Sequence, residues 1–231
     1  WETLAVGFKP YSTNGSCHPT IDALLQLRQT EGLRAADVAK LDVFCSSATK
    51  EHVGWAYRPG SVTTAQMNLP YIAAVVLTDG EAFTDQFTQQ RIGDPALLEL
   101  AGRVHVHADP EIDARGDTAR HATRLEVTRT DGTALRDSRE YARGSARRPL
   151  RADEVIDKYR KSARHGLTEP AALRLEQMVQ QLDQVADITE LAEALRGPVA
   201  HNGPPPEAGT ATAAERGRAP TQSHAHEGIK P

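Results

Sequence analysis

The residues with the greatest capacity for chemistry lie close together near the start of the chain. Lys9 precedes a Pro10-Tyr11 turn, a small polar loop follows from residue 12 to residue 17, and His18 stands at the start of an expected helix. An ammonium group, loop amides, an imidazole and the positive end of a helix dipole could together bind one carboxylate. The simpler alternative is a solvated lysine beside a histidine that caps the helix.

Cys17 and His18 also suggest a thiolate–imidazolium pair. Adjacent residues usually point in different directions, and the sequence indicates no separate Asn or Asp that would orient the imidazole. A small, unreactive loop cysteine is therefore the favoured interpretation. Tyr71 lies next to Pro70 on an apolar segment and could place a phenol in a cleft, although a tyrosine on a helix is more often a core residue.

Three histidines suggest a metal site only weakly. His105 and His107 would share one face of an expected strand, and His121 could lie across the same sheet. No thiolate or carboxylate motif accompanies them, so the solvent-exposed face of a sheet is the favoured alternative, and we expect no metal.

Composition excludes several classes of protein. The chain has 231 residues, a net charge of −4 and two cysteines. The interleaved acidic and basic residues give no clustered positive patch, so no nucleic-acid partner is expected. The longest apolar run, 72–77, is far shorter than the roughly 20 residues that cross a bilayer, so no membrane partner is expected. The two cysteines favour a reducing cytoplasm, and Trp1 in place of Met predicts that a preceding segment is missing.

The pattern of apolar residues predicts helices before and between strands, which is an α+β arrangement that ends near Gly144. Its expected helices cover 19–28, 64–79 and 96–102. The second is bent or restarted at Pro70 and ended by Gly80, and the third is capped by Asp94. Its expected strands cover 38–45, 103–108, 123–130 and 134–141, the last two forming a hairpin around Asp131-Gly132. Three further helices are expected at 152–163, 169–185 and 188–196, and disorder from 197 onward.

A set of short motifs follows a fixed order along roughly residues 4–163. They are Phe8-Lys9-Pro10-Tyr11, Cys17-His18-Pro19, Thr20-Ile21-Asp22-Ala23-Leu24, Tyr57-Arg58-Pro59, the segment 64–75, Gly80, Tyr141-Ala142-Arg143-Gly144 and Pro149-Leu150. In order and spacing they resemble the MmgE/PrpD family, which includes 2-methylcitrate dehydratase, cis-aconitate decarboxylase and iminodisuccinate epimerase.

The resemblance implies a two-domain architecture of which this chain holds the later part. Residues 1–148 would form an α+β lid domain with a short antiparallel sheet and helices. Residues 149–196 would be C-terminal helices that return to an otherwise missing all-α domain, and 197–231 a disordered tail. The three helices would then need partner helices that the chain does not supply.

The resemblance also implies residue roles. Lys9 matches the lysine that grips a substrate carboxylate, His18 the histidine that follows the loop, and Tyr71 the tyrosine that faces the cleft. We therefore expect these three to be catalytic. Asn14 stands where some members carry a histidine in mid-loop, which counts against decarboxylase-like specificity.

Lys9 and the loop residues Asn14, Gly15, Ser16 and Cys17 are expected to bind the substrate. The implied chemistry removes a proton next to a carboxylate of a small di- or tricarboxylate and eliminates water, with no metal or organic cofactor and with the general base outside this chain. Such a reaction needs a dry site with cations and hydrogen bonds. The open alternatives are an epimerase or decarboxylase of the same family, or a truncated, non-catalytic fragment that binds a ligand or dimerises. A homodimer is expected.

Overall fold

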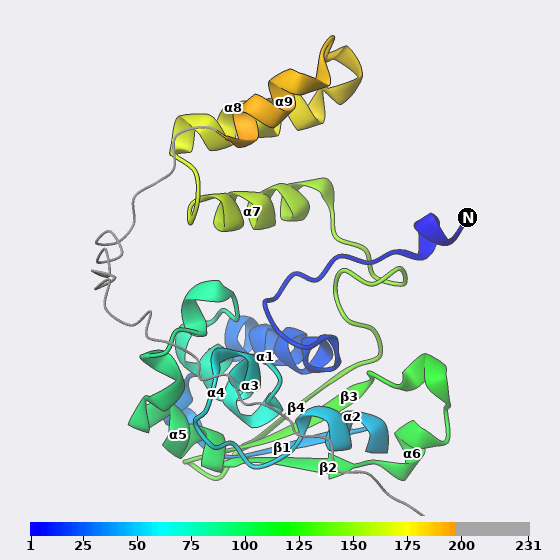
Figure 1. Cartoon of the computed structure of the whole chain (residues 1–231). Helices are drawn as coiled ribbons and strands as arrows, with labels where there is room; N and C mark the ends of the chain where they lie inside the picture. Colours follow the sequence, from blue (N-terminus) through cyan, green and yellow to red (C-terminus); the bar gives the residue numbers. More distant parts are fainter. Residues whose placement is uncertain (197–231) are drawn as a thin grey trace, which may run out of the picture. The chain divides into compact units, whose positions relative to one another are not determined.

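The computed structural model describes residues 1–196, and the chain divides into two compact units (Figure 1). The first unit is Trp1–Lys161, and the second begins at Ser162. The expected disorder of 197–231 lies outside the described residues. Among residues 1–196, no helix has both the length and the apolar character needed to cross a bilayer.

A four-stranded sheet lies in the first unit, in the order β2-β1-β3-β4. Its strands are β1 (Val38–Cys45), β2 (Val104–Ala108), β3 (Thr123–Arg129) and β4 (Ala134–Arg139). The α+β class is confirmed. The expectation of a short antiparallel sheet is wrong for one pair, because β1 and β2 are parallel. Parallel strands need a long crossover connection, and here the segment between β1 and β2 supplies four helices for it.

The predicted hairpin joins β3 to β4 in antiparallel register, with Leu125 opposite Asp137. Gly132 has a φ of 85°, a conformation that glycine adopts without steric cost. The Asp131 carboxylate accepts a hydrogen bond of 2.8 Å from the backbone N–H of Thr133. The Asp-Gly pair therefore forms the tight hairpin turn that the sequence predicts.

Helix α1 (His18–Thr30) contacts β3 and β4, whereas α4 (Leu69–Asp79) contacts β2; both lie on the same side of the sheet in Figure 1. The expected helix at 64–79 is two helices, since α3 (Val62–Gln66) ends before Asn68 caps a new start with Pro70 in its first turn. Gly80 ends α4 in the left-handed conformation, as expected.

The remaining helices are α2 (Ser47–Val53), α5 (Pro95–Gly102), α6 (Pro110–Asp113), α7 (Ala152–Ala163), α8 (Glu169–Gln180) and α9 (Ile188–Leu195). The sequence patterns did not predict α2 and α6, which are short. Asp94 caps α5 as expected, its side chain accepting from the backbone N–H of Ala96 at 2.9 Å. Helix α8 is shorter than predicted, and a separate 3-10 turn (Leu182–Gln184) follows it.

Candidate functional site

The loop that carries Lys9 is attached to the segments on both sides of α4. The backbone N–H of Ser12 donates to the Ala82 carbonyl at 3.0 Å, and that of Asn14 donates to the Gln66 carbonyl at 2.9 Å. Backbone hydrogen bonds of this kind leave the loop little freedom, because both of its neighbours belong to the packed first unit. The loop is therefore a fixed platform and not a solvated connection.

Asn14 shapes the middle of this loop. Its side-chain oxygen accepts from the backbone N–H of Ser16 at 2.9 Å, its carbonyl accepts from that of Cys17 at 3.0 Å, and its amide group lies 3.4 Å from the sulfur of Met67. The resulting 3-10 turn (Gly15–Cys17) leads directly into α1. The amides of Ser16 and Cys17, which we expected to bind a carboxylate, are thus already engaged within the turn. Asn14 also has its polar atoms engaged there.

Lys9 is the exposed cation of the loop. A Cβ added to Gly15 would lie 3.9 Å from Lys9 Cε, so the lysine side chain extends over the 3-10 turn. Within residues 1–196, Lys9 forms no ion pair with a carboxylate. An exposed ammonium group without a counter-ion among the described residues is available to an anionic ligand, and the substrate-binding role of Lys9 stays a prediction.

His18 is almost fully buried, with 3% of its surface exposed. One ring nitrogen bonds to the Thr13 backbone, whereas Nε2 has no partner, and the ring meets that of Tyr11 edge-on at 5.1 Å. Burial lowers the pKa of His18 to about 4, opposed by the Thr13 hydrogen bond and assisted by the charge of Lys9. The imidazole is therefore neutral near pH 7, so it adds no positive charge to a carboxylate site.

Cys17 is fully buried. Burial raises the pKa of its thiol and lowers that of the His18 imidazole, and both shifts disfavour a thiolate–imidazolium pair. Cys45 is likewise buried and reduced, and burial raises its pKa to about 12. Burial of the thiol favours the interpretation of Cys17 as an unreactive loop cysteine, and its expected part in substrate binding stays a prediction.

Tyr71 lies in the core, although we expected it to face a cleft. It has no exposed surface, and its hydroxyl donates to the Gln86 carbonyl at 3.2 Å. Its ring packs 4.5 Å from that of Tyr57 and 6.1 Å from that of Phe87. Residues 69–77 of α4 are all buried, which leaves the helix no face on which Tyr71 could reach a ligand. The structure thus brings Lys9 and His18 together but does not place Tyr71 with them.

The histidines of β2 lie on the sheet as an ordinary polar face. His107 Nε2 lies 2.7 Å from Asp42 Oδ1, and its ring stacks on Phe44 at 5.0 Å, while His105 is exposed. In the described part of the chain, no group of three His, Cys, Asp or Glu side chains could hold a metal ion.

The comparison with protein-family models shows which family the chain belongs to. The model of the MmgE/PrpD C-terminal domain matches residues 11–184. The chain belongs to the MmgE/PrpD family. The resemblance read from the motifs is therefore confirmed. The match runs to residue 184, beyond residue 163, where the motifs end.

Relatives within the MmgE/PrpD family include cis-aconitate decarboxylases. The chain is 30% identical to the Aspergillus terreus enzyme over 208 residues, which is 86% of this chain and 42% of the relative. It is 29% identical to the cis-aconitate decarboxylase-like protein oryM of Aspergillus oryzae, over 85% of this chain and 42% of that protein. It is 26% identical to the Homo sapiens cis-aconitate decarboxylase, over 86% of this chain and 42% of that protein. The chain thus spans less than half the length of these relatives.

A cleft of about 510 Å³ lies beside Tyr11 in this MmgE/PrpD domain, and Lys9 does not line it. Its charged lining is balanced, because Lys161 pairs with Glu81 and Arg143 with Glu154, both at 2.8 Å. Such internally paired charges exert little net attraction on an anion. The cleft is thus a poorer candidate for a carboxylate than the surface around Lys9.

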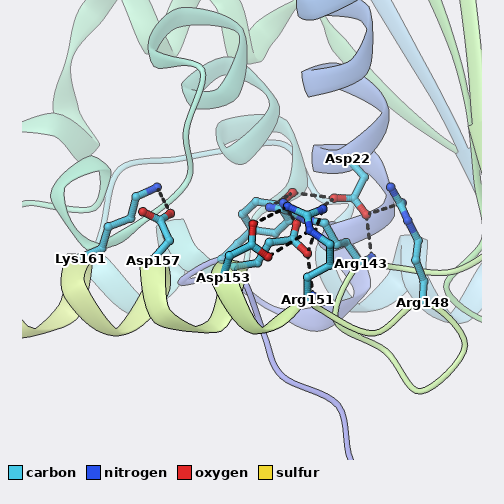
Figure 2. A network of polar contacts seen from close by, with 9 residues as sticks. Asp22, Arg143, Arg148, Arg151, Asp153, Asp157 and Lys161 are labelled. Carbon is cyan, nitrogen blue, oxygen red and sulfur yellow. Dashed lines mark hydrogen bonds and ion pairs between the residues drawn. The ribbon is translucent and has the colours of Figure 1, made fainter. Parts of the chain in front are cut away.

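Asp22 and Arg143 organise the site but were missed as functional residues by the sequence reasoning. The Asp22 carboxylate is buried in α1 and accepts from the Tyr11 hydroxyl at 2.5 Å and from the Arg143 backbone N–H at 2.7 Å. Figure 2 shows Arg148 approaching the same carboxylate, at 3.2 Å. The available signal was an acidic residue beside the apolar stripe of the expected helix. Nothing in the sequence linked it to Arg143 and Arg148, which are more than 100 residues away.

Proposed function

We propose that this chain supplies the Lys9 loop of a cofactor-independent lyase that acts on a small di- or tricarboxylate. The observation that carries the proposal is the exposed ammonium group of Lys9, which forms no ion pair with any residue from 1 to 196, on a loop whose backbone is fixed. Because the backbone that carries it is fixed, the ammonium group would stabilise negative charge with little reorganisation of the loop as the reaction proceeds. The general base and the rest of the substrate pocket would come from a segment outside this sequence.

Two reactions make the same demand on Lys9. Dehydration breaks a C–H and a C–O bond and releases water; decarboxylation breaks a C–C bond, releases CO₂ and adds a proton to the carbon. Either path builds negative charge next to a carboxylate, which an adjacent ammonium group stabilises. Lys9 would therefore serve either reaction, and its position does not distinguish dehydration from decarboxylation.

The relatives support decarboxylation, because those compared are named as cis-aconitate decarboxylases. Dehydration of the 2-methylcitrate type is the second candidate, favoured by Asn14 at the position where some family members carry a histidine. The Asn14 side chain is engaged in the turn, so it does not replace a histidine as a proton carrier. We also propose a cytoplasmic homodimer, in keeping with the sequence-based expectation.

The test is turnover by the full-length protein with Lys9→Met. We expect kcat/KM to fall by about 100-fold or more, since one oriented charge contact contributes about 2–4 kcal/mol to the transition state. The melting temperature should be nearly unchanged, because Lys9 is exposed. The assay screens cis-aconitate, 2-methylcitrate and similar acids, following alkene absorbance and released CO₂ in parallel.

The matched control is Lys40→Met, which removes an exposed lysine that pairs with Asp42 on the sheet. It makes the same change of charge and should leave turnover within about twofold of the wild type, because a surface ion pair contributes little. Equal turnover by Lys9→Met and the wild type would refute the role of Lys9.

A further inference from the structure

Gly144 meets the backbone of the segment that carries Lys9. Its φ is 86°, and a Cβ built on it would lie 1.9 Å from the Phe8 carbonyl oxygen and 3.2 Å from Pro10 Cδ. A Cβ on Gly7 would in turn lie 2.6 Å from the Gly144 carbonyl oxygen. Two glycines thus allow two backbones to approach more closely than any side chain permits.

This approach fixes the residues on either side of Lys9. The Phe8 backbone N–H donates to the Gly144 carbonyl at 2.8 Å, and Pro10 packs against the same glycine. Because a proline also restricts the residue before it to extended conformations, the backbone of Lys9 is constrained from both sides. The direction in which its side chain leaves the chain follows from that constraint.

The turn formed by residues 142–148 is itself rigid. The Gly144 N–H donates to the Arg148 carbonyl at 2.7 Å, and the Ser145 hydroxyl donates to the Ala142 carbonyl at 2.7 Å. The Arg143 N–H is held by the buried Asp22 carboxylate of α1, as seen beside Arg148 in Figure 2. Arg143 also donates to the Tyr11 hydroxyl at 3.2 Å. The turn therefore connects the Lys9 segment to the helix that follows the loop.

We propose that Gly144 is a positioning residue that sets where the Lys9 ammonium group stands relative to the substrate. It never touches the substrate and acts only through Phe8 and Pro10. The inference rests on the proposed function, since it assigns to Gly144 the geometry of a lysine that binds carboxylate. A displacement of about 1 Å at a reacting group lowers turnover by about 100-fold, so the side chain of an alanine is a sufficient disturbance.

The experiment compares Gly144→Ala with Gly132→Ala in the full-length protein. Both glycines have positive φ, 86° and 85°, but a Cβ on Gly132 meets no atom within 4 Å. The two variants therefore share the backbone cost, and only Gly144→Ala displaces Phe8. We expect kcat/KM to fall by about 100-fold for Gly144→Ala, and to stay within about twofold for Gly132→Ala. Equal kinetics of the two variants would overturn the proposal.

A double variant separates positioning from general damage. If Gly144 acts through Lys9, adding Gly144→Ala to Lys9→Met should cause no further loss of kcat/KM. If the double variant instead lost kcat/KM by the product of the two single losses, the glycine would have only a structural role, and the proposal would be overturned. Gly7→Ala provides the same test should Gly144→Ala not fold, because its Cβ pushes on the same contact from the other side.

Hydrogen exchange at the Phe8 amide tests the geometry without turnover. The wild type and Gly132→Ala should protect this amide, and Gly144→Ala should lose the protection; retained protection would overturn the proposal. If Lys9→Met leaves turnover unchanged, the proposed function fails, and exchange at Phe8 still decides whether Gly144 holds the segment.

Discussion

The two units of this chain contain helices of similar pattern but very different burial. In the first unit, α1 and α4 bury large side chains completely, among them Ile21, Leu24 and Ile72. In the described part of the second unit, Leu175 is the buried large apolar residue. Five large apolar side chains there are exposed, namely Leu173, Val179, Leu182, Ile188 and Leu195.

The difference shows that helical periodicity and helical stability are separate properties. Apolar residues at helical spacing are enough to form α8 and α9, but most of the stability of a short helix comes from packing an apolar face against other elements. The first unit has such packing and holds the Lys9 loop on it. The described part of the second unit leaves such side chains exposed, and the expectation that its helices need partner helices stays a prediction.

The largest effect should come from truncating an isoleucine in each unit. Ile72→Ala removes a fully buried side chain from α4 and should lower the free energy of unfolding by about 4 kcal/mol, through lost burial and a cavity. Ile188→Ala makes the same change on α9, where the side chain is 63% exposed, and should cost less than about 0.5 kcal/mol. Urea denaturation followed by circular dichroism measures both. Similar losses for the two variants would contradict the comparison.

Acid should destabilise the first unit through His18. The pKa of His18 is about 4 in the folded state and 6.5 when unperturbed, so between these values the unfolded chain binds a proton that the folded chain does not. The contribution of His18 to the free energy of unfolding is therefore constant above pH 6.5. It falls by about 3 kcal/mol as the pH drops to 4 and is constant again below pH 4. His165, in the second unit, is exposed.

The measurement is the free energy of unfolding between pH 7 and pH 4 for the wild type and for His18→Gln. Carboxylates also titrate in this range, so the difference between the two proteins isolates His18. The variant should show the shallower decline. If the free energies of unfolding of the two proteins declined in parallel with falling pH, His18 would not be buried in its neutral form. The two units would then differ in apolar burial and not in the burial of a titratable group.

Local patterns predicted most of the elements of the first unit. The ends of β1 were correct to the residue, and Asp94, Asp131-Gly132 and Gly80 are the cap, the turn and the stop that the sequence predicts. These features depend on neighbours within a few residues. The parallel pairing of β1 with β2 was not predicted, because it depends on which strands meet after a crossover, and no short segment encodes that choice.

The candidate site shows the same division between local and distant information. The sequence placed Lys9 and His18 together, because both belong to one loop that precedes a helix. It did not reveal that Tyr71 is enclosed by its own packed helix, or that Gly144 lies against Phe8. Burial and close approach depend on residues that are distant in sequence, so only the folded chain shows them.

The smallest effects should come from removing a helix cap in each unit. Asn68→Ala should cost about 2 kcal/mol in the free energy of unfolding, because Asn68 is fully buried and bonds both the Tyr71 N–H at 2.9 Å and the Trp55 carbonyl at 2.7 Å. Asp187→Ala removes an exposed cap of α9, whose carboxylate accepts from the Thr189 N–H at 2.9 Å. It should leave the unfolding of the first unit unchanged and only speed hydrogen exchange in the first turn of α9. A loss of first-unit stability in Asp187→Ala would show that the two units unfold together, and would remove the contrast between them.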